Sequence, residues 1–402
     1  MIYTVIAKPT KACNADCSYC SSPPDDANAW SIEDFKNIFD RVSPGISDSC
    51  YWIWHGGEPM LQGPDFYQEA YEYAIKTKPN INFSMQTNIL LYKSKRWKSI
   101  FRDIFQGRIS TSFDPEVHLR TIKGDAKKYE TQFRKKLAEV LEDGFEPLVI
   151  SVFNEANASK MIEMYDWASQ SRGNTFHVRF NYQYPAGRAS DLGDIIKPKT
   201  YGENLLEIYE RWIAEFPPFD VVPLSQMLQK VIGGDVDQCP WTNSCGGKFL
   251  SIEPNGDLYN CGDFADLGDE KYRFGNAKNL TISGTKKENI VGFYRKEDPA
   301  NFVKKVMSSP AVHLMSQRRV NVPSDCYSCR HYKECQGGCM RDAELYGRGL
   351  GGKFYYCESW KMVFDRIKSS ILSGEADNLL TEMGKDVDAI KAHVYSYNQE
   401  IA

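Results

Sequence analysis

The stretch Cys13-Asn14-Ala15-Asp16-Cys17-Ser18-Tyr19-Cys20 carries three cysteines, separated by three and then two residues. It follows Tyr3–Lys8, a run of β-branched and aromatic residues that predicts a strand. In a parallel α/β sheet the loop that leaves a strand lies at the carboxyl edge, where ligands bind. Three thiolates can hold three irons of a cubane cluster and leave the fourth iron open to a small molecule that carries an amine and a carboxylate. A zinc loop or three buried thiols are the alternatives.

The chain around this loop alternates predicted strands with segments of helical periodicity. Ser31 and Asp34 form a capping-box pattern at the start of an apolar helical stripe. Parallel strands need helical crossovers, so we predict an α/β fold, an open, partial (β/α)6 barrel over residues 1–182. The further strands expected in it are Tyr51–Trp54, Ile81–Gln86, Arg108–Phe113, Pro147–Phe153 and Phe176–Tyr182.

The composition excludes several classes of protein. Of 402 residues, 42% are hydrophobic and the net charge is −4, so the chain can build a large core and has no basic excess for binding nucleic acid or an anionic membrane. No apolar run is long enough to span a bilayer and no cleavable signal follows Met1, so we expect a cytoplasmic protein. Twelve cysteines in a reducing compartment indicate metal or redox chemistry rather than disulfides.

Beyond Tyr182 the pattern changes twice. The turn-rich run Tyr184-Pro185-Ala186-Gly187-Arg188 predicts an exit from the barrel into a helical bridge over 183–238. Residues 239–360 are rich in loops and carry eight of the cysteines, so metal is expected to supply much of their rigidity. Helical spacing returns in a C-terminal tail over 361–402. Cys50 stands apart from the other cysteines and is expected to be a small buried apolar residue.

The Cys13–Cys20 stretch resembles the signature of the radical S-adenosylmethionine (SAM) superfamily, including the aromatic Tyr19 before the third cysteine. The resemblance implies that Cys13, Cys17 and Cys20 hold a [4Fe–4S] cluster that binds SAM. In that superfamily the cluster cleaves SAM reductively to methionine and a 5′-deoxyadenosyl radical, which removes a hydrogen from the substrate. A reductant such as flavodoxin or ferredoxin is then an expected partner.

Further segments resemble the SAM contacts of that superfamily. Gly56-Gly57-Glu58-Pro59 follows the second strand, where the superfamily has the turn that holds the SAM amino group, and glycines allow a close backbone approach. Arg120 could pair with the methionyl carboxylate, because a guanidinium matches a carboxylate. A strand-end turn and a solvated surface charge are the alternatives for these polar residues. The other resembling positions are Asn88, Ser112 and Asp114.

The cysteines of 239–360 resemble a second pattern, the SPASM extension of radical SAM enzymes that modify peptides and proteins. The resemblance implies two auxiliary [4Fe–4S] clusters, and so three clusters in the whole chain. Tetrahedral zinc sites are the alternative, since Cys-x2-Cys pairs bind zinc well. The implied ligands are Cys239, Cys245, Cys261 and Cys339 for one auxiliary cluster and Cys326, Cys329, Cys335 and Cys357 for the other.

Asp263 is the candidate general base. Loss of a hydrogen atom leaves a substrate radical, which must lose an electron and a proton to give a closed-shell product, and a carboxylate near the substrate can accept the proton. In the sulfatase-maturing relatives an Asp directly follows the cysteine that corresponds to Cys261, whereas here Gly262 intervenes. A solvated hairpin carboxylate is the alternative for Asp263.

The substrate is expected to be a peptide or protein. One hypothesis is a maturase of a ribosomally made precursor peptide (a RiPP maturase) that forms a cross-link or ring. It is favoured by Gly262 and by the segment Phe176–Ala189, whose ending Tyr-Pro-Ala-Gly-Arg-Ala resembles that of many peptide maturases. The other is an anaerobic sulfatase-maturing enzyme that oxidises Cys or Ser to formylglycine. A strand near Tyr3 leaves no room for a fused leader-binding module, so a separate leader-binding protein is a further expected partner. A non-catalytic iron–sulfur electron carrier is the alternative from another class.

Overall fold

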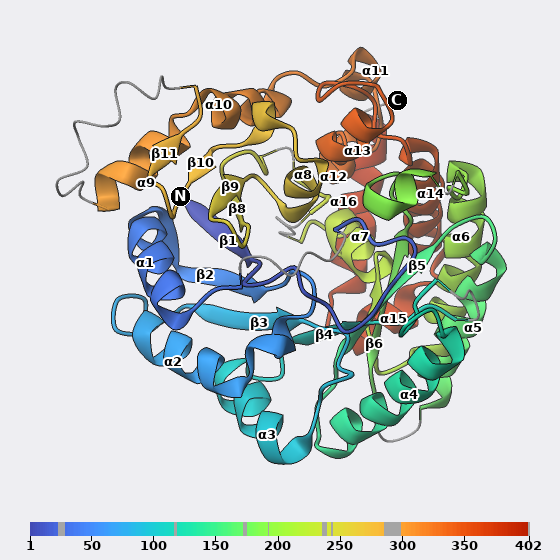
Figure 1. The fold of residues 1–402 in the computed structure, drawn as a ribbon. Coiled ribbons are helices and arrows are strands. Elements are labelled where there is room, and N and C mark those ends of the chain that lie inside the picture. Colours follow the sequence, from blue (N-terminus) through green and yellow to red (C-terminus); the bar gives the residue numbers. More distant parts are fainter. Residues whose placement is uncertain are drawn as a thin grey trace.

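The computed structural model of the chain describes residues 1–22, 29–115, 119–171, 175–191, 193–234, 239–242, 244–284 and 299–400. Its centre is an 11-stranded sheet in the order β11-β10-β9-β8-β1-β2-β3-β4-β5-β6-β7. Figure 1 shows the sheet curving around an interior, with helices from α1 to α6 along its outer side. The predicted α/β fold, an open parallel barrel, is confirmed.

The six predicted strands are all present and pair in parallel in chain order. Exposure alternates along them: in β5 and β6 every second residue is buried toward the outer helices, and the residues between face the barrel interior. The strands are β1 (Ile2–Ala7), β2 (Ile46–Trp54), β3 (Asn82–Gln86), β4 (Ile109–Ser112), β5 (Leu148–Phe153) and β6 (His177–Tyr182).

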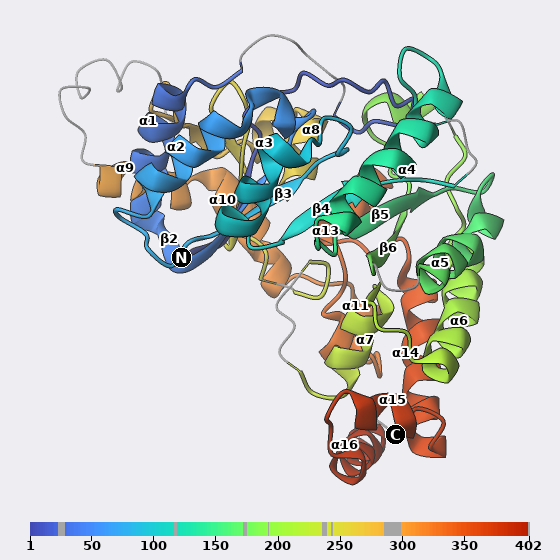
Figure 2. The same ribbon diagram turned by 90° about the horizontal axis from the view of Figure 1, so that it is seen from below.

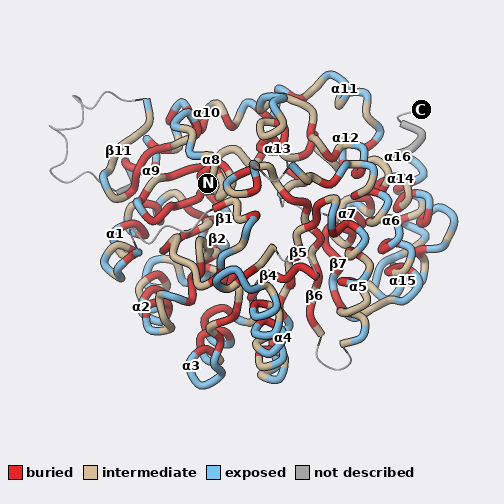
Figure 3. The backbone as a smooth tube through the Cα atoms, turned by 45° about the vertical axis from the view of Figure 1, so that its right-hand side comes forward, coloured by how far each residue is buried: buried red, intermediate tan, exposed pale blue. Residues whose placement is uncertain are grey.

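Helices cover the outer face of these strands. The capping box predicted at Ser31 is present, since its side chain accepts from the backbone N–H of Asp34 and the Asp34 carboxylate accepts from the backbone N–H of Ser31. From the helix that follows, Phe35 and Phe39 pack against Trp52. The helices are α1 (Ile32–Val42), α2 (Pro64–Ala74), α3 (Ser94–Ser99), α4 (Ala126–Glu142), α5 (Met161–Gln170) and α6 (Pro198–Glu215). Figure 3 shows buried backbone concentrated on the sheet and on the inner sides of these helices.

Two features of the sheet differ from the prediction. The second strand begins at Ile46, so Cys50 lies within it and is fully buried. The sheet also continues past β1 into the cysteine-rich region, because β8 pairs in parallel with β1. The strands past β1 are β8 (Phe249–Ile252), β9 (Asp257–Tyr259), β10 (Gly275–Asn276) and β11 (Thr281–Ile282), and β7 (Val221–Val222) pairs with β6 at the other edge.

The second half is more helical than the sequence predicted. Helices α6 and α7 (Leu224–Val231) lie within 183–238, the range predicted as a helical bridge, and α14 (Cys357–Ser373) packs along α6 (Figure 2). The expected start of the tail, 361, falls inside α14, and the expected end of the bridge, 238, lies outside the described residues. No described helix is both long and apolar enough to cross a membrane. The helices are α7 (Leu224–Val231), α8 (Gly262–Leu267), α9 (Pro299–Met307), α10 (Pro310–Ser316), α11 (Ser324–Tyr327), α12 (Tyr332–Cys335), α13 (Met340–Leu345), α14 (Cys357–Ser373), α15 (Asp377–Glu382) and α16 (Val387–Glu400).

Candidate functional site

The three-cysteine loop after β1 lies directly against the Gly56–Pro59 turn after β2. The backbone N–H of Gly57 donates to the Thr10 carbonyl at 2.9 Å, and that of Glu58 donates to the Ala12 carbonyl at 2.8 Å. A Cβ atom on Gly57 would lie 2.2 Å from the Ala12 carbonyl oxygen, so only glycine permits this approach. The two motifs found separately in the sequence therefore form one surface.

Glu58 is fully buried beneath that surface. Its carboxylate accepts from the Met60 N–H at 2.9 Å, from the Thr87 hydroxyl at 2.6 Å and from the Asn88 N–H at 2.7 Å. Burial raises the pKa of Glu58 to about 7, against these hydrogen bonds that lower it. A buried carboxylate at this position suits an ammonium group, which would relieve the cost of burying its charge.

Three of the side chains expected near SAM, those of Asn88, Asp114 and Arg120, contact the cysteine loop. The Asn88 amide donates to Asn14 at 2.6 Å and lies 3.9 Å from the Cys13 sulfur. The Asp114 carboxylate accepts from the Tyr19 hydroxyl at 2.5 Å and from Arg120 Nε at 2.6 Å. Asp114 and Arg120 thus both contact Tyr19, the aromatic residue of the cysteine loop. Ser112 lies on β4 and accepts from the Gln86 amide at 2.8 Å.

Arg188, which the sequence indicated only as part of a turn, also holds the loop. Its guanidinium donates to Asp16 at 2.6 Å, and its backbone N–H donates to the Cys20 carbonyl at 3.0 Å. A Cβ on Gly187 would lie 2.4 Å from the Ser21 carbonyl oxygen. The segment after β6 therefore contacts the cysteine loop at Asp16, Cys20 and Ser21.

Cys13, Cys17 and Cys20 form the first thiol group. Burial raises the pKa of all three thiols, that of Cys13 to about 12, and Cys17 and Cys20 lie near enough to raise the pKa of Cys13 further. Coordination to iron removes such a proton outright. The residues present thus fit a cluster held at three corners, with Glu58 beside them as an additional anionic group.

A second thiol group contains Cys239, Cys245, Cys261 and Cys339. A hydrogen bond with Cys239 lowers the pKa of Cys339, while the same bond, together with burial, raises the pKa of Cys239. Cys339 in turn raises the pKa of Cys245 and Cys261, in which burial is the main cause. These side chains come from three separate stretches of sequence, and the structure brings them within electrostatic range of one another. Their role as ligands of one cluster stays a prediction.

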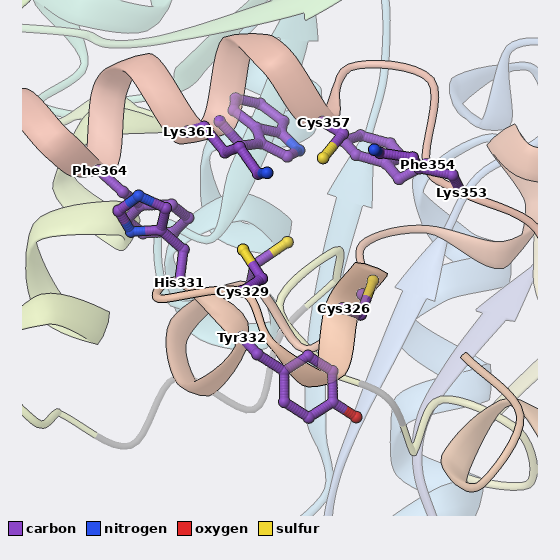
Figure 4. Close-up of a pocket in the computed structure, with 12 residues that line it drawn as sticks. Cys326, Cys329, His331, Tyr332, Lys353, Phe354, Cys357, Lys361 and Phe364 are labelled. Atoms are coloured by element: carbon purple, nitrogen blue, oxygen red, sulfur yellow. The ribbon is translucent and has the colours of Figure 1, made fainter. Parts of the chain in front are cut away.

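The third thiol group lines a pocket (Figure 4). Burial raises the pKa of Cys335 to about 12, and the neighbouring thiols raise it further. Trp360 also lines the pocket, and its buried indole N–H has no hydrogen-bond partner among the described residues. A buried donor of this kind suits the sulfur atoms of a cluster. The thiols here are Cys326, Cys329, Cys335 and Cys357, the second implied set.

No group of three or more His, Cys, Asp or Glu side chains within the described ranges is arranged to hold a single metal ion. A cubane cluster takes one thiolate at each corner, so its ligands lie farther apart than those of one ion.

Asp263 lies at the start of α8, and its side chain is 42% exposed. Arg341, buried on α13, donates to it at 2.7 Å and lies 3.6 Å over the ring of Tyr184. The same guanidinium contacts Asp342, which accepts a hydrogen bond from Tyr182. Arg341 was not predicted from the sequence, although the charged Arg341–Asp342 pair soon after Cys339 was a visible signal.

Lys8 joins the barrel to the cysteine-rich region. Its buried ammonium group pairs with Asp266 at 2.7 Å and Glu253 at 3.0 Å and donates to the Gly262 carbonyl at 3.3 Å. Burial lowers the pKa of Lys8, but the two carboxylates outweigh it and the pKa is raised. Gly262, the residue inserted before Asp263, is therefore held in place by Lys8, which directly follows β1.

Comparison with known proteins gives the same picture. No family model matches the chain. A cysteine-type anaerobic sulfatase-maturating enzyme of Clostridium perfringens is 23% identical over 397 residues, which cover 90% of this chain and 95% of that protein. The structure of anSMEcpe with bound AdoMet and the Kp18Cys peptide superposes with a TM-score of 0.72 at 19% identity, over 93% of this chain and 99% of that chain. Streptococcus suis SuiB bound to the precursor peptide SuiA gives a TM-score of 0.60 at 14% identity, over 89% and 76%.

The expectation of an enzyme acting on a peptide or protein is supported by the same relatives. The comparisons confirm the resemblance that the motifs indicated: the homologues of this chain are radical SAM enzymes of the anaerobic sulfatase-maturating type, and its fold is the one that they and SuiB share.

Proposed function

We propose that this chain is a radical SAM maturase that oxidises one residue of a peptide segment. The observation that carries the proposal is the contact between the three-cysteine loop and the Gly56–Pro59 turn, with a buried carboxylate beneath it. When bound, SAM and a [4Fe–4S] cluster would supply a radical that removes a hydrogen atom from the substrate. Flavodoxin or ferredoxin is the proposed reductant, and the protein is proposed to be cytoplasmic.

Asp263 is the proposed acceptor of the substrate proton. Its carboxylate is partly exposed, and the buried guanidinium of Arg341 donates a charge-assisted hydrogen bond to it. The remaining electron would pass to the two auxiliary thiol groups, each proposed to hold a [4Fe–4S] cluster, for three clusters in all. Residues 1–182, 183–238, 239–360 and 361–402 are the proposed barrel, bridge, SPASM region and tail.

Two substrate classes are supported by different observations. Gly262, held by Lys8, shifts Asp263 one residue along the chain from its place in sulfatase-maturing enzymes, which favours a ribosomally made precursor peptide that gains a cross-link or ring. The sulfatase-maturating relatives, matched over nine-tenths of both chains, favour oxidation of Cys or Ser to formylglycine. A separate leader-binding protein belongs to the first class alone.

One experiment separates these classes. Reduced, anaerobically reconstituted enzyme is incubated with SAM and either a sulfatase-derived peptide or the short peptide encoded beside its gene, and products are analysed by mass spectrometry and an aldehyde-reactive probe. A product that loses a pair of hydrogens and does not react with the probe supports the cross-link. A probe-reactive product supports formylglycine. Absence of 5′-deoxyadenosine in every reaction contradicts both.

A further inference from the structure

Arg318 is a buried cation without a carboxylate partner. It is 3% exposed, as part of a short helical turn, Gln317–Arg319, that follows α10. The other buried cations described, Lys8, Arg341 and Lys368, each pair with a carboxylate. No ion pair of Arg318 is present among the described residues, and its Nε has no hydrogen-bond partner there. An unpaired buried charge is costly, so an anion is needed beside it.

The guanidinium contacts the loop that joins the two auxiliary thiol groups. One terminal nitrogen donates to the Gly337 carbonyl at 2.6 Å, between Cys335 of one group and Cys339 of the other. The other terminal nitrogen donates to the Leu350 and Gly352 carbonyls at 3.0 and 2.9 Å. These three backbone bonds fix the position of the guanidinium but supply no negative charge.

The cysteines of both groups lie within electrostatic range of this cation. Burial lowers the pKa of Arg318, whereas Cys326, Cys335, Cys339 and Cys245 each act to raise it. A Cβ on Gly246, next to Cys245, would lie 2.7 Å from the Met315 carbonyl, so that turn packs on the helix end leading to Arg318. Two cysteine thiols of each auxiliary group thus act electrostatically on the guanidinium of Arg318.

We propose that Arg318 is the shared counter-charge of the two auxiliary clusters and favours the reduced form of both. The inference rests on the proposed function, since it requires both clusters. A cluster ligated by four thiolates gains one negative charge on reduction, and net charge and nearby hydrogen bonds set its potential. A fixed cation between two such sites stabilises the added electron on either one.

The test is a redox titration followed by electron paramagnetic resonance (EPR) on the full-length, anaerobically reconstituted protein. Arg318→Gln keeps a donor for Gly337 but removes the charge, and should lower both auxiliary potentials by about 59 mV, a tenfold change for a one-electron couple. Arg318→Lys keeps the charge and should remain near the unmodified protein. Arg319→Gln, the exposed neighbour, is the control and should change neither potential.

The cluster proposed at Cys13, Cys17 and Cys20 serves as an internal reference, because Arg120 and not Arg318 is the cation acting on Cys17 and Cys20. Unchanged auxiliary potentials in Arg318→Gln, with about twelve irons per chain, overturn this inference and leave the proposed function standing. About four irons in the unmodified protein overturn this inference and the two auxiliary clusters, whereas absence of 5′-deoxyadenosine overturns the proposed function itself. If Arg318→Gln fails to retain iron, retention by Arg318→Lys supports the role of charge, and loss in both variants contradicts it.

Discussion

Arg341 donates to the Asp263 carboxylate at 2.7 Å while its guanidinium lies 3.6 Å from the centre of the Tyr184 ring. Arg341 thus links Tyr184, which follows β6, to Asp263 at the start of α8. This hydrogen bond fixes the direction from which the Asp263 carboxylate can accept a proton. A freely rotating surface carboxylate has no such fixed direction.

Replacing Asp263 by Asn should separate radical formation from product formation. We expect product to fall by about a hundredfold or more, the usual contribution of a general base, while 5′-deoxyadenosine still forms. Both are measured by liquid chromatography and mass spectrometry. Asp257→Asn, a carboxylate on the same hairpin paired with Arg273, is the matched control and should keep product. Full product formation by Asp263→Asn would remove this residue from the mechanism.

Gly57→Ala should displace the three-cysteine loop. The added Cβ would lie 2.2 and 2.3 Å from two backbone carbonyl oxygens, which flexible side chains cannot relieve. We expect SAM binding and 5′-deoxyadenosine formation to be lost while the circular dichroism spectrum is retained. Gly63→Ala adds a Cβ into open space and should cost only the strain of its backbone, φ 80° and ψ 159°, about 1–3 kcal/mol. Equal activity of the two variants would contradict the close approach.

Glu58 should make the stability of the cluster-free, SAM-free protein depend on pH. Its pKa is raised from 4.5 to about 7, so the folded state binds more protons than the unfolded state between these values. The contribution of Glu58 is therefore present below pH 4.5 and lost as the pH rises through about 7, by about 3 kcal/mol. Urea unfolding of the native protein and of Glu58→Gln at pH 5 to 8 measures it. Parallel pH profiles would show that Glu58 does not titrate in this range.

Cys329→Ala should remove one auxiliary cluster selectively. Iron should fall from about twelve to about eight per chain, since each [4Fe–4S] cluster holds four. Cys50→Ala is the control, because this thiol lies buried within β2, away from the three groups, and its loss should leave iron unchanged. Iron and zinc are measured by inductively coupled plasma mass spectrometry. Stoichiometric zinc in the native protein would contradict the assignment.

The barrel could be predicted from the sequence because the patterns that indicate its strands and helices each lie within a short segment. The alternation of buried and exposed residues in β5 and β6, and the capping box at Ser31, are each contained in a few consecutive residues. The pairing of β1 with β8 could not be predicted, since it joins segments more than two hundred residues apart, and a strand signal in one segment does not say which other strand it pairs with.

The same limit applies to the candidate site. The cysteine groups were implied by a resemblance, because the crossed order, in which Cys339 joins Cys239 rather than Cys335, has no local signature. The sequence did not predict a role for Lys8, Arg341 or Arg318. The role of a charged side chain depends on its burial and on its partner, and neither can be read from neighbouring residues. Lys8 has carboxylate partners from a distant part of the chain, and Arg318 has none among the described residues.

The most direct measurement is SAM cleavage by reduced, reconstituted protein, followed by quantifying 5′-deoxyadenosine and methionine. The prediction is that both appear in equal amounts and disappear in Cys17→Ala. Bound iron–sulfur clusters that accept electrons without cleaving SAM, in protein with a full iron content, would contradict the central claim and indicate an electron carrier instead.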